Sequence, residues 1–209
     1  MIVSEVFKSR MKEYSRIQTP MTGREVAERM LRENGITDVQ VVCTGGMLTD
    51  HYNPTNKTVN LSKDVYEGAN LSAMAVAAHE CGHAVQHEVG YAPLELRTAL
   101  VPVVSFSSKW VMWVILAGLL LIKTFPHLML IGIILFAMTT LFSFVTLPVE
   151  INASRRALSW MEESMLVSRD DLPKASAALR SAAYTYVVAA LSSLATLLYY
   201  IAIYSGSRR

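Results

Sequence analysis

A stretch of 20 residues without a single charge, LMLIGIILFAMTTLFSFVTL at residues 128–147, constrains this chain more than any other part of the sequence. A helix needs about 20 predominantly apolar residues to cross the hydrocarbon core of a bilayer. The alternative is a buried helix of a soluble domain, but buried core helices are usually shorter. We therefore expect a transmembrane helix at this position.

Two further apolar segments flank this stretch. WVMWVILAGLLLI at residues 110–122 precedes it across the short polar turn KTFPH, and YTYVVAALSSLATLLYYIAIY at residues 184–204 follows it. The last segment carries tyrosines at both ends, as expected for aromatic side chains at membrane interfaces. The sequence thus predicts a transmembrane hairpin over residues 100–147 and a C-terminal transmembrane helix over residues 183–205.

The overall composition agrees with a membrane protein. The chain is 52% hydrophobic and 17% charged, whereas about 25% of the residues in an average globular domain are charged. A net charge of +2, with no basic run interleaved with aromatic residues, gives no reason to expect a nucleic-acid partner. Two cysteines are too few for a disulfide framework and fit a reducing compartment.

The remaining residues form two polar parts, at 1–99 and 148–182. Thr22 and Glu25 have the spacing of a capping box, and Gly35 stands where the helix that they begin should end. The alanine-rich sequence LSAMAVAAHECGHAVQHEV predicts a second helix, which Gly90 and Pro93 should end. We expect a mainly α-helical integral membrane protein with a small β element.

The β element should come from VQVVCTGG and KTVNLS, with DHYNPTN as a turn-rich connection. We expect residues 58–61 to form an edge strand that could hold an extended peptide, and Cys43 to lie in the core. Asp50, His51 and Tyr52 either shape the turn or line a cleft. Cys81 should also lie in the core, because it is about 200° around its helix from His79.

The alanine-rich helix carries the motif His-Glu-x-x-His. His79 and His83 are four residues apart, so their imidazoles project from one helix face about 6 Å apart along the axis and can hold one Zn²⁺ ion. Glu80 lies beside that face and can take a proton from an attacking water molecule. This is the arrangement of zinc peptidases.

A catalytic site with two histidines needs a third protein ligand. The metzincin extension of the motif would require glycine at position 86 and histidine at 89, but the chain has Gln86 and Val89. His87 lies one turn beyond His83, and three successive histidines on a straight helix cannot all reach one tetrahedral ion. We expect His87 to be a surface histidine or to support a ligand.

Glu150, in LPVEINASRRA, is the better candidate for the third ligand. The chain should cross the membrane twice between His83 and Glu150, and an even number of crossings returns Glu150 to the side of the two histidines. Glu162 and Glu163 are rivals in a more ordinary polar helix.

VAAHECGHAVQHEVGYAPLELRTALVPV and LPVEINASRRAL, together with GGMLTDHYNPTNKTVNLSKDVY, resemble the bacterial neutral zinc metallopeptidases of the YugP type. These are multi-pass membrane proteins grouped with gluzincin-like peptidases. The resemblance runs from about residue 14 to about residue 200. It implies that His79, His83 and Glu150 are zinc ligands and that Glu80 is the catalytic base. The order of the motifs is also similar to that of HtpX-type membrane proteases.

The sequence departs from these families at two positions near the expected ligand. Asn152 stands where the YugP type is expected to have an acidic residue, and Ser154 stands where HtpX-type proteins have an aspartate. Family members also tend to begin with a membrane segment, whereas this chain has only MIVS before its polar residues, which leaves the number of spans open.

The sequence therefore predicts a zinc-dependent endopeptidase of the cell membrane that acts on peptides or membrane-protein segments, with its site on the cytoplasmic side. A membrane protein that only binds or senses zinc is the alternative. Such a protein would need the three ligands but not a base at Glu80. A metal transporter is less consistent with the sequence, because no span carries several ionisable residues. The sequence does not indicate the oligomeric state.

Overall fold

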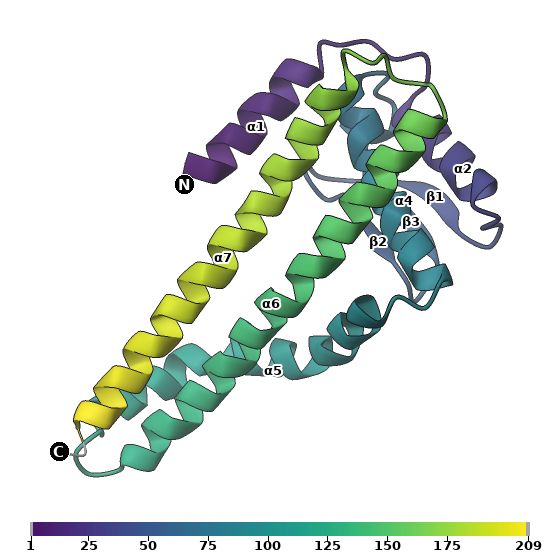
Figure 1. Ribbon diagram of the computed structural model, residues 1–209. Coiled ribbons are helices and arrows are strands. Elements are labelled where there is room, and N and C mark those ends of the chain that lie inside the picture. The colour runs from purple at the N-terminus through teal and green to yellow at the C-terminus, as the bar shows by residue number, and fades with distance from the viewer. Residues whose placement is uncertain (1, 208–209) are drawn as a thin grey trace. The chain divides into compact units, whose positions relative to one another are not determined.

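The computed structural model describes residues 2–207 and is mainly helical with one three-stranded sheet (Figure 1). The elements follow one another as α1 (Ile2–Tyr14), α2 (Gly23–Glu33), β1 (Gln40–Thr44), β2 (His51–Asn53), β3 (Thr58–Ser62), α3 (Lys63–Tyr66), α4 (Leu71–Glu88), α5 (Ala92–Leu120), α6 (Pro126–Glu163) and α7 (Leu172–Gly206). The predicted fold class of a mainly α chain with a small β element is confirmed.

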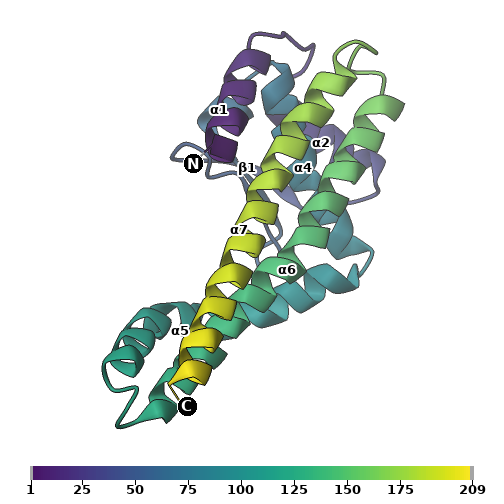
Figure 2. The same cartoon turned by 60° about the vertical axis from the view of Figure 1, so that its left-hand side comes forward.

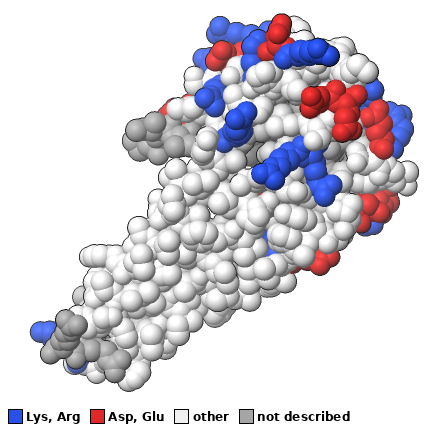
Figure 3. Space-filling view, in the orientation of Figure 1, with Lys and Arg blue, Asp and Glu red and all other residues white. Residues whose placement is uncertain are grey.

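The chain divides into two compact units. The polar unit consists of Met1–Tyr91 and Val149–Thr185, and the apolar unit consists of Ala92–Pro148 and Tyr186–Arg209. Most of the charged side chains in view gather on the polar unit, whereas the visible surface of the apolar unit is almost entirely uncharged (Figure 3). Helices α6 and α7 each contribute one half to each unit.

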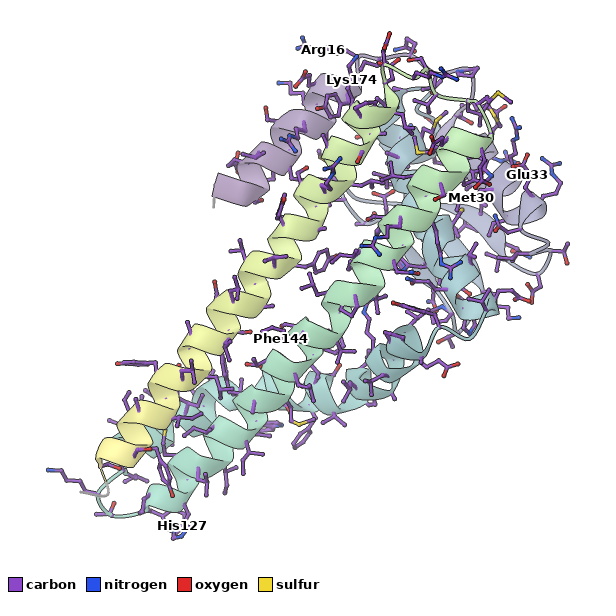
Figure 4. The ribbon with its side chains drawn as sticks, viewed as in Figure 1. Arg16, Met30, Glu33, His127, Phe144 and Lys174 are labelled. Carbon is purple, nitrogen blue, oxygen red and sulfur yellow. The ribbon has the colours of Figure 1, made fainter. Side chains whose placement is uncertain are left out.

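Within the described residues, three helices are long and apolar enough to cross a membrane: α5, α6 and α7. α5 and α6 form a hairpin whose turn contains Lys123, Thr124 and Phe125 of the predicted KTFPH segment, while Pro126 and His127 begin α6 (Figure 4 labels His127). The hairpin is close-packed because it has glycines at its contact. A Cβ atom at Gly118 would lie 2.7 Å from the Cα of Met129, and one at Gly132 would lie 2.8 Å from the side chain of Ile115. Small residues permit such close approach between helices.

The sheet has the order β1-β3-β2, with β1 parallel and β2 antiparallel to β3. The expectation that residues 58–61 form an edge strand is therefore wrong: β3 is central, and both of its edges are already paired. The connection DHYNPTN contains the short strand β2, which the sequence analysis assigned to a turn. The edge strands of the sheet are β1 and β2, and β2 lies within the connection DHYNPTN.

The predicted helix signals are present in the polar unit. Thr22 and Glu25 form both hydrogen bonds of a capping box at the start of α2, and Gly35 follows that helix with a positive φ of 74°. α4 begins at the N-cap Asn70, whose side chain accepts a hydrogen bond from the backbone of Ala73. Gly90, with a φ of 60°, follows its end.

The core of the polar unit surrounds α4, which contacts α2 and lies beside the sheet. α2 is tied to the second half of α6 by Glu33, which accepts a hydrogen bond of 2.7 Å from the indole of Trp160 (Figure 4 labels Glu33). α1 lies beside the first turns of α7, where Arg10 donates to the carbonyl of Ala177 (Figures 1 and 2). α4 is therefore packed against other elements on several sides.

The two cysteines have different environments. Cys81 is fully buried and its thiol donates to the carbonyl of Ala27, as expected for a core residue. Cys43 is exposed, so its predicted place in the core is wrong. β1 is an edge strand, and its exposed positions are Gln40 and Cys43.

Candidate metal centre

Two helices of the polar unit bring three potential metal ligands together. α4 supplies His79 and His83, and α6 supplies Glu150 at the start of its second half. One ligand atom from each residue lies within 4.8 Å of the other two, and the group could hold a metal ion. The Nε2 atoms of His79 and His83 lie 3.2 Å and 3.8 Å from the same carboxylate oxygen of Glu150.

These distances fit a zinc ion. Metal–ligand bonds of about 2.0–2.1 Å in a tetrahedron place neighbouring ligand atoms roughly 3.3 Å apart. Two imidazoles and one carboxylate are a donor set that zinc accepts in catalytic sites, where a fourth position is left to water. His83 and Glu150 are buried and His79 is partly exposed, so the centre can be reached from the side of His79.

The second nitrogen of His83 is held by a polar chain that runs from α4 to α6. Nδ1 of His83 lies 3.0 Å from the side-chain oxygen of Gln86. The amide nitrogen of Gln86 donates in turn to the carbonyl of Val149 and to the side chain of Asn152, which also accepts from Arg156. Because Gln86 is fully buried, this chain fixes the imidazole with Nε2 directed at the centre.

His79 is oriented in the same way by a different residue. Its Nδ1 lies 3.1 Å from the hydroxyl of Ser154. Asn152 and Ser154 are the two positions at which the sequence was expected to depart from related families. Ser154 contacts His79 directly, and Asn152 accepts a hydrogen bond from Gln86, which supports His83.

Glu80 is nearly buried beside the two histidines and is held by the sheet. The backbone N–H of Tyr52 in β2 donates to the Glu80 carboxylate over 3.0 Å. The hydroxyl of Tyr52 lies 2.8 Å from Nδ1 of His87. Tyr52 thus contacts the predicted base, whereas His87 lies outside the metal group and supports Tyr52 at the surface.

Asp50 has a structural role. Its carboxylate accepts hydrogen bonds from the backbone N–H and the hydroxyl of Ser62, over 2.7 Å and 3.0 Å. These bonds close the connection between β1 and β2 onto the end of β3. Of the three residues whose role the sequence left open, Asp50 shapes the loop and Tyr52 contacts the candidate site.

A glycine sets the distance between the two helices that carry the ligands. A Cβ atom at Gly82 would lie 2.6 Å from the backbone oxygen of Ala153 in α6. Gly82 lies one residue before His83, and Ala153 lies three residues after Glu150. Only a residue without a side chain lets α4 and α6 approach closely enough for their ligands to meet.

The pKa of His83 depends on its burial and on the polar and charged groups around it. Burial lowers the pKa of His83, but the neighbouring carboxylates of Glu150 and Glu80 and the bond to Gln86 raise it by more, so its pKa lies above its ordinary value. In the absence of a metal the imidazole therefore holds a proton more tightly than a free histidine does. A metal ion that binds here must displace that proton.

The predicted rivals of Glu150 are absent from this group. Glu162 and Glu163 lie three turns further along α6 and do not belong to the metal group found among the described residues. The sequence analysis assigned no role to Gln86, although it lies three residues after His83. It also predicted no specific contact for Asn152 and Ser154, which lie two and four residues after Glu150. Those helical spacings were the available signal.

Comparisons with known proteins identify the family of this chain. Residues 1–205 match the family described as "Putative neutral zinc metallopeptidase". A protein of Bacillus subtilis (strain 168) named "Putative membrane protease YugP" is 42% identical over 203 residues, which cover 96% of this chain and 89% of that protein. No solved structure matches the chain. The chain belongs to this neutral zinc metallopeptidase family.

Proposed function

We propose that this member of the neutral zinc metallopeptidase family is a membrane endopeptidase whose Zn²⁺ is held by His79, His83 and Glu150. The observation that carries the proposal is the convergence of the His-Glu-x-x-His face of α4 with Glu150 of α6. The Nδ1 atoms of His83 and His79 are held by Gln86 and Ser154, and the Nε2 atoms of both rings face the buried carboxylate of Glu150. The ligands are therefore already oriented for a metal ion. Its partly open position at His79 leaves room for a substrate.

Each remaining residue of the centre has a separate task. Zinc, when bound, lowers the pKa of a water molecule and polarises a carbonyl group. Glu80 takes the proton of the attacking water and passes it to the amine that leaves. The N–H of Tyr52 holds the Glu80 carboxylate in place for this transfer. Gln86 and Ser154 keep Nε2 of the two histidines directed at the ion.

The substrate would be an extended peptide or a membrane-protein segment. β2 contributes Tyr52 to the centre and is an edge strand, so an extended substrate could lie along its outer side. The N–H of Tyr52 is already bound to Glu80, so β2 would guide the substrate to the base without adding it as a full strand of the sheet. Residues 58–61 lie in the middle of the sheet and are not open to a substrate.

The protein would act in the cell membrane, with α5, the first half of α6 and the last part of α7 in the bilayer. The hairpin of α5 and α6 crosses twice, which leaves residues 1–99 and 148–182 on the same side. Most Lys and Arg residues lie in those two parts, which favours the cytoplasmic side by the positive-inside rule.

Zinc content and cleavage, measured together, test the proposal. His79→Ala, His83→Ala and Glu150→Ala should each lose bound zinc and peptide cleavage, because two protein ligands hold the ion poorly. His87→Ala, the matched control on the same helix, should keep its zinc. Zinc retained in Glu150→Ala but lost in His87→Ala would refute the ligand set. Zinc binding without cleavage of any peptide would favour the zinc-sensing alternative.

A further inference from the structure

α4 is buried along almost its whole length, and its open positions coincide with the metal centre. Over residues 71–86, the side chains that are not buried are those of Val76 and His79. Residues three apart on a helix are neighbours on one face. A molecule that approaches the metal through His79 therefore also meets Val76.

Val76 forms part of the wall of a cavity of about 630 Å³, which α1, α4 and the loop between β1 and β2 enclose. The walls are mainly apolar, with Phe7 and Met11 on α1 and Met47 and Leu48 on the loop. Ligand-binding pockets commonly have volumes in this range and walls that are mostly apolar. Polar residues also line it: Lys8 and Lys12 on α1, Asp64 on α3, and Asp50, whose carboxylate accepts hydrogen bonds from Ser62.

Two separate chain segments lead from this cavity to Glu80. Along α4, Val76 lies one helical turn before Glu80. Along the loop and β2, Asp50 lies two residues before Tyr52, whose N–H binds the Glu80 carboxylate. The cavity therefore begins one helical turn from the predicted base along α4, and two residues from Tyr52 along the loop; Glu80 itself is not part of its wall.

The loop that closes one side of the cavity presents apolar side chains without covering them. Met47 is 82% exposed and Leu48 is 62% exposed. Leu48 also has a positive φ of 57°, a conformation that is uncommon for residues other than glycine. An apolar group that enters the cavity would remove part of this surface from water.

We propose that this cavity is the subsite for a large apolar side chain, such as leucine, methionine or phenylalanine, next to the bond that is cleaved. This inference rests on the proposed peptidase function and names the class of substrate that it acts on. A substrate backbone that lies along β2 would pass Glu80, and the side chain that turns towards α1 would enter the cavity. Selectivity then comes from the apolar wall of Val76, Met47 and Leu48.

Binding to an inactive protein tests the subsite independently of turnover. The zinc-loaded Glu80→Gln variant is titrated calorimetrically with an alanine-based host peptide that carries one central leucine and with its all-alanine counterpart. We expect the leucine peptide to bind roughly 10- to 100-fold more tightly, the range that apolar pockets give for added methylene groups. Equal affinities, or no binding of either peptide, would overturn the subsite.

Substitutions locate the preference. Val76→Phe narrows the cavity beside α4 and should lower the affinity ratio, whereas Val89→Phe, at the exposed end of the same helix, should leave it unchanged. Met47→Ser, on the exposed loop, should lower the ratio without disturbing the core, which decides the question if Val76→Phe does not fold. An unchanged ratio in Met47→Ser and in any folded Val76→Phe protein would refute the subsite.

The same peptides distinguish the two proposals. If wild-type protein cleaves them without a preference for leucine, the subsite is wrong and the peptidase function stands. If the leucine peptide binds selectively but no zinc-dependent cleavage occurs with wild type, the subsite stands and the peptidase function fails.

Discussion

Replacing Gly82 by alanine should separate the ligands of the metal centre without removing any of them. The added Cβ atom would lie 2.6 Å from the oxygen of Ala153, about 0.8 Å short of the 3.4 Å at which ordinary contact begins. The oxygen belongs to the backbone of α6, so it cannot rotate away, and α4 and α6 must move apart. Overpacking of this kind costs about 1–3 kcal/mol of the free energy of unfolding.

The cost to metal binding should be larger than the cost to stability suggests. Metal–ligand distances tolerate changes of about 0.2 Å, whereas the helices must separate by several times that amount between His83 and Glu150. We expect zinc affinity to fall by at least about 10-fold, comparable with the loss of a supporting hydrogen bond. The observable is the dissociation constant of zinc, measured by competition with a chromogenic chelator, together with the thermal midpoint of the metal-free protein.

Gly206→Ala provides the matched control. It makes the same change at the end of α7, where a Cβ atom would meet nothing within 4 Å. Zinc affinity and thermal midpoint should both stay at the wild-type value in this control. Wild-type zinc affinity in Gly82→Ala would show that the separation of α4 and α6 does not set the geometry of the centre, and would refute the reasoning.

Two further predictions concern the pH dependence of the centre and the two cysteines. Because the pKa of His83 is raised in the metal-free fold, its stabilising contribution is complete below the unfolded value of about 6.5 and is lost as the pH rises through the folded value. Over the same pH range zinc affinity should rise, because less of His83 is protonated. The thermal midpoint of the metal-free protein should therefore fall with rising pH, while the increase in thermal midpoint caused by added zinc should grow. If both quantities rose or both fell with pH, the reasoning would be contradicted. A maleimide should label the exposed Cys43 and spare Cys81, whose thiol pKa is raised by burial. In intact cells a membrane-impermeant maleimide should label neither cysteine if the polar unit is cytoplasmic, and labelling of Cys43 would reverse the proposed orientation.

The parts of the fold that the sequence predicted depend on local spacing. The capping box of Thr22, the glycine after α2 and the three apolar helices follow from residues close together in the chain, and all are present. Glu150 was identified by counting the predicted membrane crossings, because this count determines which distant residues lie on the same side of the membrane. The structure places it beside His79 and His83.

The parts that the sequence did not predict depend on contacts between distant segments. β1 and β3 are direct neighbours in the sheet and run parallel, although β2 lies between them in the sequence. No local pattern shows that β3 is the central strand. β2 is only three residues long and runs into an Asn-Pro turn signal, which hides it. Cys43 is exposed because the rest of the fold leaves its position on β1 uncovered, which no local pattern shows.

The supports of the histidines were missed for the same reason. Ser154 of α6 reaches His79, and Gln86, which contacts His83 within α4, reaches Asn152 of α6, only because the two helices approach closely at Gly82 and Ala153. The sequence shows each residue on its own helix, but the alignment of the two helices is a property of their packing.

Glu80→Gln tests the central claim most directly, because it keeps the size of the side chain and leaves all three proposed ligands in place. The measurement is the initial rate of peptide cleavage per zinc-loaded molecule, for wild type and variant in the same detergent. Glutamine cannot accept the proton of the attacking water, so the rate should fall by roughly 10²- to 10⁴-fold, the usual contribution of a positioned general base. Zinc content should match wild type. Equal rates at equal zinc content would contradict the account, because cleavage would then proceed without Glu80 as its base.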